Sequence, residues 1–133
     1  MDTKALITAY YQAFNEGRTD DMLKMLADDV EHHVNEGGVR KGIEMFREFN
    51  AHMTSSYKEL LTDIVVFANR SGDRAAAEFV VNGTYLKTDE GLPEANGQTY
   101  RLPAGTFFDV KGGKITRVTT YYNLNEWTRQ VVG

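Results

Sequence analysis

The first third of the chain carries hydrophobic residues at the spacing of amphipathic helices. Leu6, Tyr10 and Phe14 share one face of a first helix, which Asp2 or Thr3 can cap. The same spacing predicts a short second helix from about residue 19 to 26, closed by residues 27–30, and a third helix at about 42–53. Between the last two, residues 30–35 alternate like a short strand, and two glycines at 37–38 interrupt it.

From residue 57 onward the hydrophobic pattern changes to a period of two. It predicts strands at about 57–69, 74–86, 99–110 and 115–123, with a polar loop at 87–98 and a short terminal helix at 124–132. Helices followed by hairpin-linked strands predict an α+β fold with an antiparallel sheet. We expect three N-terminal helices packed on a strongly curved antiparallel sheet, forming a cone with an internal pocket.

The length, net charge and amino-acid composition of the chain exclude several classes of protein. A chain of 133 residues predicts one domain, residues 1–133. The net charge of −4 argues against nucleic acid as a partner, and the absence of cysteine excludes thiol catalysis and thiolate metal sites. No segment is apolar for long enough to form a signal peptide or a membrane span, so we predict a cytoplasmic protein with no membrane partner.

Two titratable residues in predicted strands are the first candidates for chemistry. His32 shares strand parity with Val30 and Val34, so it faces inward if they do. An imidazole in an apolar pocket suits general acid–base catalysis, although a core histidine bonded to its neighbours is the plain alternative. Glu78 lies in an apolar strand, either in a pocket or facing solvent. Because His33 must face away from His32, the pair cannot chelate one metal ion, and no metal site is predicted.

Aromatic and polar residues supply candidate ligand contacts. Tyr122 shares parity with the apolar side of the last strand, and Tyr10 lies on the inward face of the first helix. With Trp127 they can line a cavity and donate hydrogen bonds to a carbonyl group, although such aromatics are more often plain core. Asn35 and Thr106 are candidate polar contacts at the pocket rim. The basic residues Arg40, Arg47 and Lys58 are interpreted as solvated surface charges.

The order of elements and two local sequences resemble a known family. YYQAFNEGRTDDMLKMLADDVEHHV resembles the opening of the SnoaL-like, ketosteroid-isomerase-related branch of the nuclear transport factor 2-like superfamily. The tail LPAGTFFDVKGGKITRVTTYYNLNEW is similar to the matching end of those proteins. The resemblance implies a deep apolar pocket and a homodimer through the outer sheet face. Since that face is then buried, the resemblance leaves the orientation of Glu78 open.

The resemblance also allows a comparison with the catalytic residues of true ketosteroid isomerases. Tyr10 falls where the oxyanion-binding Tyr of true ketosteroid isomerases lies, but the position of their catalytic base falls on or next to Val34. Their protonated Asp falls near Thr106 or Phe107. Neither position carries a carboxylate, which argues against steroid isomerisation by that mechanism.

The functional expectation is a small SnoaL-like enzyme without a cofactor that acts on an apolar carbonyl or polyketide-like molecule. Isomerisation, cyclisation or dehydration would begin with proton abstraction by His32 or Glu78, and Tyr10 and Tyr122 would bind the developing oxyanion. Val34 and Trp127 would contact the ligand. One alternative is a pocket that binds a small hydrophobic metabolite without catalysis, and another is a dimerising scaffold whose cavity is filled by its own side chains. The sequence therefore leaves open whether the protein is an enzyme.

Overall fold

The N-terminal helices form where the hydrophobic spacing predicts them. The structure is a computed structural model, and it describes residues 2–34 and 37–132. Helix α1 (Thr3–Asn15) begins at Asp2, whose side chain accepts a hydrogen bond of 2.7 Å from the Ala5 amide, which satisfies one of the free amides of the first turn. Helix α2 (Thr19–Lys24) follows after Gly17, which adopts a φ of 71°.

The segment from residue 26 to residue 56 differs from the prediction in three places. Strand β1 (Leu26–Val34) includes residues 27–30, which were expected to close the second helix, and a short strand β2 (Val39–Lys41) was not predicted. Helix α3 (Ile43–Ser56) extends three residues beyond its expected end. β1 starts early because its first residue pairs with Ile115, a partner that the local sequence cannot reveal.

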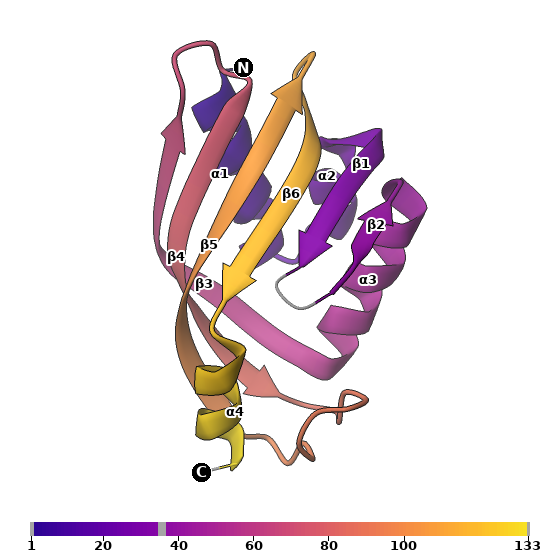
Figure 1. Cartoon of the computed structure of the whole chain (residues 1–133), viewed down its shortest axis with the longest axis vertical. Helices are drawn as coiled ribbons and strands as arrows, with labels where there is room; N and C mark the ends of the chain where they lie inside the picture. Colours follow the sequence, from indigo (N-terminus) through magenta and orange to yellow (C-terminus); the bar gives the residue numbers. More distant parts are fainter. Residues whose placement is uncertain (1, 35–36, 133) are drawn as a thin grey trace.

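The C-terminal half follows the period-two pattern. Strands β3 (Tyr57–Ala68), β4 (Arg74–Tyr85), β5 (Thr99–Lys111) and β6 (Lys114–Tyr122) precede helix α4 (Leu124–Val132). The described residues form one six-stranded sheet in the order β2-β1-β6-β5-β4-β3 (Figure 1). The pairing of β1 with β6 is parallel and the others are antiparallel, so the expectation of a wholly antiparallel sheet is wrong at this one pair.

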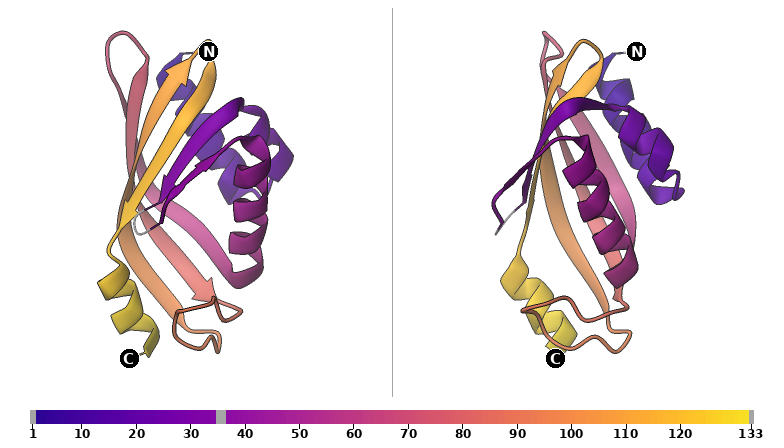
Figure 2. Two further views of the ribbon diagram at one scale, coloured as in Figure 1. Left: turned by 45° about the vertical axis from the view of Figure 1, so that its right-hand side comes forward. Right: turned by 90° about the vertical axis from the view of Figure 1, so that its right-hand side faces the viewer.

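The sheet curves, and helices α1 and α3 pack on the same side of it (Figure 2). Tyr11 of α1 contacts Phe79 of β4 with ring centroids 5.1 Å apart, and α4 covers the far end of the same sheet face through Trp127, which packs on Tyr85 at 5.1 Å. We call this the inner face. The predicted α+β architecture, helices packed on a strongly curved sheet, is therefore confirmed.

The other side of the sheet, the outer face, carries large apolar side chains without cover in the single chain. Val65, Phe67, Phe107 and Tyr121 are each 44–57% exposed, and the rings of Phe107 and Tyr121 lie 5.9 Å apart. A monomeric soluble protein rarely exposes so many large apolar groups side by side. None of the helices in the described ranges is long and apolar enough to cross a membrane.

Candidate functional site

β1 turns His32 toward the inner face, together with Val30 and Val34 two residues to either side. The His32 side chain is only 5% exposed. Its ring centroid lies 4.7 Å from the rings of both Phe46 and Phe49 on α3. The structure therefore places this imidazole inside the molecule, between the sheet and two phenylalanine rings.

The His32 ring is neutral, and one of its two nitrogens has no hydrogen-bond partner among the described residues. Its Nδ1 is buried, and no residue in the described part of the chain forms a hydrogen bond with it. Burial lowers the pKa of His32 to about 4, and the nearby charges of Arg40 and His33 act in the same direction. A buried polar atom without a partner costs about 1–3 kcal/mol, so a ligand that bonded this nitrogen would recover that free energy.

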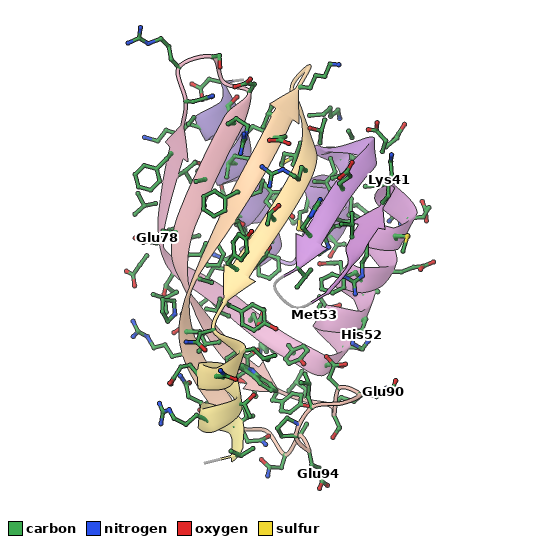
Figure 3. All side chains as sticks on the ribbon, in the orientation of Figure 1. Lys41, His52, Met53, Glu78, Glu90 and Glu94 are labelled. Carbon is green, nitrogen blue, oxygen red and sulfur yellow. The ribbon has the colours of Figure 1, made fainter. Side chains whose placement is uncertain are left out.

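A pocket opens beside α3, next to the 87–98 loop. Its volume is about 360 Å³, and its lining combines apolar side chains with charged ones: Arg40, Met45, Glu48, Phe49, His52, Met53 and Asp89. Figure 3 shows His52 and Met53 near the end of α3 that is closest to the 87–98 loop. Phe49 contacts His32 and also lines the pocket, whereas His32 itself is not among the residues that line it.

The 87–98 loop is tied to the pocket through Asp89. The Tyr57 hydroxyl donates a hydrogen bond of 2.7 Å to Asp89 Oδ2, and His52 Nε2 lies 2.9 Å from Asp89 Oδ1. The Tyr85 hydroxyl donates to the Pro93 carbonyl at 2.6 Å. Side chains of β3, β4 and α3 thus hold the loop against the rim of the pocket.

A second polar centre lies on the inner face near α4. The Tyr100 hydroxyl donates a hydrogen bond of 2.5 Å to the Glu59 carboxylate. Burial raises the pKa of Glu59, although the bond from Tyr100 opposes that change. The Tyr100 ring crosses β4 at Gly83, the one residue type that leaves room for it, and it also packs against Trp127 with ring centroids 6.0 Å apart.

Two of the predicted contacts lie deep in the core beneath α1. The Tyr11 hydroxyl and Thr106 Oγ1 share a hydrogen bond of 2.7 Å, so Thr106 is buried and already bonded. Tyr10 is 5% exposed and packs edge-on against Phe108 at 6.0 Å. Burial raises the pKa of Tyr10, so its hydroxyl stays protonated and can act as a donor.

The remaining predicted ligand contacts are distributed along the inner face. Val34 pairs with Thr120, and Tyr122 pairs with Ala104, so both side chains face the helices and are partly buried. Trp127 is 4% exposed and completes the aromatic cluster at the α4 end. Asn35 lies outside the residues that the structure describes.

Glu78 does not join this group. It is exposed on the outer face, paired with Val65 and Gly105, while its neighbours in sequence, Ala77 and Phe79, fill the core. Figure 3 shows Glu78 on β4, on the opposite side of the molecule from α3. The hypothesis of a Glu78–His32 acid–base pair is therefore wrong, because strand parity puts the two side chains on opposite faces of the sheet.

Sequence reasoning missed two charged residues of the inner face. Arg40, interpreted as a solvated charge, is directly opposite His32 in the β1–β2 register and lines the pocket. β2 has only three residues, too few for its pattern to show which face is buried. Glu59 could have been found only by noting that it shares parity with Tyr57 and Leu61, both of which are buried.

Comparisons with known proteins agree with the fold. The sequence profile of the SnoaL-like domain matches residues 7–118. A protein from Pseudomonas putida KT2440, provisionally described as a polyketide cyclase, is 53% identical over 98% of both chains, with a TM-score of 0.97. One from Silicibacter sp. TM1040 with the same description is 60% identical over 98% of this chain and 95% of its own, with a TM-score of 0.95.

More distant structures show the fold alone. A protein of unknown function from Burkholderia pseudomallei K96243, described as NTF2-like, is 17% identical over the full length of both chains, with a TM-score of 0.77. No curated protein matches the chain. The resemblance seen in the sequence is confirmed by the profile, which covers well over half of the chain. This chain belongs to the SnoaL-like domain family and has an NTF2-like fold.

Proposed function

We propose that this protein is a small enzyme that uses His32 as a general base on an apolar, polyketide-like carbonyl compound, without a cofactor. The observation that carries the proposal is the buried, neutral imidazole whose Nδ1 no described residue bonds. Its relatives described provisionally as polyketide cyclases support carbonyl chemistry as the reaction class.

The first step would break a C–H bond next to the carbonyl group. The proton moves to the imidazole, and the electron pair of the broken bond forms a carbon–carbon double bond while the carbonyl oxygen becomes an enolate. Since the pKa of His32 is held at about 4, the imidazole is fully deprotonated at neutral pH. The imidazolium that forms is a strong acid, so it readily returns the proton in the second step.

The second step decides the product. In an isomerase the imidazolium protonates a different carbon of the enolate. In a cyclase the enolate carbon attacks a second carbonyl carbon of the same molecule, and the new alkoxide takes the proton from His32. Tyr10 and Tyr122 are the proposed donors to the enolate oxygen, each worth a few kcal/mol when well placed. Val34 and Trp127 are the proposed apolar walls. Glu78 has no part, because it faces away.

Exchange of carbon-bound protons tests the proposal directly. Aryl ketones and β-diketones are incubated with the protein in D₂O, and loss of the α-proton signal is followed by NMR. We expect His32→Gln to slow the exchange by about 100-fold to 10,000-fold. The matched control is His33→Gln, because His33 faces away from His32 and bonds Glu31 at 3.2 Å. Equal rates for wild type and His32→Gln, with the fold intact by circular dichroism, would overturn the proposal.

The alternative is a binding protein without turnover. One observation favours it: no carboxylate in the described part of the chain hydrogen-bonds His32, so the imidazole lacks the orienting acid common in catalytic pairs. Under this alternative the ketones raise the melting temperature of the wild-type protein but exchange no faster than in buffer.

A further inference from the structure

The pocket beside α3 contains a cation that has no anionic partner among the described residues. The guanidinium of Arg40 lies 4.4 Å from the centre of the Phe49 ring, a cation–π contact that positions it against an apolar floor. The ion pairs of the described residues use other arginines, such as Arg18, Arg47 and Arg117, and none involves Arg40. A half-buried guanidinium is a planar, fork-shaped donor suited to a carboxylate.

Neither of the two acids that line the same pocket forms an ion pair with Arg40. Asp89 is engaged by the Tyr57 hydroxyl and by His52, as described above. Glu48 is exposed to solvent. The apolar part of the lining comes from Met45, Phe49 and Met53. The pocket therefore combines an apolar floor with a guanidinium that forms no ion pair within residues 2–34 and 37–132.

We propose that Arg40 binds the carboxylate of the ligand, so that the natural substrate is a small carbonyl compound with an apolar body and a carboxylate group. The apolar body rests on Phe49 and Met53. This inference rests on the proposed function, because it assigns a substrate class to the enzyme proposed above.

The position of Arg40 couples ligand binding to the base. Arg40 is directly opposite His32 across β1 and β2, and its charge is one of the causes that lower the pKa of His32. A carboxylate on the guanidinium offsets that charge. Of the other titratable groups nearby, His33 lies on the outer face, His52 is bonded to Asp89, and Glu48 is exposed to solvent. We therefore expect the pKa of His32 to rise when a carboxylate binds, which makes the imidazole a stronger base in the complex.

Three probes of one shape test the proposal: phenylacetate, phenylacetamide and phenethylamine. Affinities are measured by calorimetry. We expect phenylacetate to bind the wild-type protein about tenfold or more tightly than the neutral amide. Arg40→Gln should abolish that preference, and Arg40→Lys should restore only part of it because a lysine lacks the planar fork. Glu48→Gln should strengthen phenylacetate binding, since it removes a negative charge from the pocket.

The matched control is Arg47→Gln. Arg47 also lies on α3, but it is exposed and pairs with Asp20 at 3.6 Å and Glu44 at 3.7 Å, outside the pocket. It should leave the preference unchanged. A histidine NMR titration gives a second measurement: saturating phenylacetate should raise the pKa of His32, and the amide should not.

Each result separates this inference from the proposed function. Equal affinity for phenylacetate and phenylacetamide in the wild-type protein, or tighter binding of the amine, overturns the inference whatever the exchange experiment shows. A carboxylate preference that depends on Arg40, found together with no proton exchange on any ketone, supports the inference and refutes the enzyme.

Discussion

Replacing Gly83 by alanine gives the most direct test of the packing around Glu59 and Tyr100. A Cβ atom at position 83 would lie 2.1 Å from Cζ and 2.4 Å from the hydroxyl oxygen of Tyr100, far closer than non-bonded carbon atoms approach. The ring must therefore move, and the 2.5 Å hydrogen bond to Glu59 is lost. Overpacking costs about 1–3 kcal/mol and a lost hydrogen bond to a charged group about 1.5–3 kcal/mol, so we expect destabilisation by about 2.5–6 kcal/mol.

Urea denaturation of four proteins measures this cost and its origin: wild type, Gly83→Ala, Tyr100→Ala and the double variant. Once the Tyr100 ring is absent, the Gly83→Ala change should be close to neutral, or stabilising by about 0.4–1 kcal/mol, because the backbone there does not have a positive φ. The double-mutant cycle should therefore show a coupling energy of several kcal/mol between the two positions.

Gly105→Ala is the matched control, because the nearest atom to its added Cβ would be the Ala77 carbonyl oxygen at an ordinary 3.6 Å. Its cost should stay below about 1 kcal/mol. If Gly83→Ala costs no more than this control, or if its cost is the same with and without the Tyr100 ring, the steric reasoning is refuted.

Two further predictions concern the inner and outer faces of the sheet. The pKa of His32 is lowered in the folded protein from 6.5 to about 4, so the neutral imidazole contributes stability fully above pH 6.5, and this is lost as the pH falls toward 4. At about 1.4 kcal/mol per pKa unit, the free energy of unfolding should fall by about 3 kcal/mol. Urea denaturation at a series of pH values should show this loss for the wild type and not for His32→Gln. If the free energies of unfolding of the two proteins change in parallel with pH, the prediction is wrong. On the outer face we expect a homodimer that buries Phe107 and Tyr121. Phe107→Glu should yield a monomer by analytical ultracentrifugation, whereas Asn96→Glu, in the 87–98 loop, should not; a monomeric wild type would refute the dimer.

Local patterns predicted most of the fold, because most elements are stabilised by neighbours in sequence. The period-two runs of β3 to β6 pair as hairpins, so their bounds were predicted to within a few residues. β1 was mispredicted at Leu26, because its pairing partner lies in β6 at the other end of the chain. A strand whose partner is distant in sequence leaves little local signal.

The candidate site was only partly predictable, because several of its contacts join residues that are distant in sequence. Strand parity was enough to propose that His32 points inward, and parity alone would also have placed Glu78 outside. Arg40 and Glu59 depend on contacts with Phe49 and Tyr100, which come from other elements. Such contacts follow from tertiary packing and leave no spacing in the sequence to detect.

The parallel pairing of β1 with β6 has a consequence for the protein during its synthesis. β1 emerges early from the ribosome, but the strand beside it is among the last segments to be translated. Until then the backbone groups along one side of β1 have no ladder partner, and the sheet around His32 is incomplete. The β3–β4–β5 hairpins can form earlier, since each pairs with its neighbour in the chain. A nascent chain arrested before β6 should therefore expose apolar surface, which makes it a substrate for chaperones.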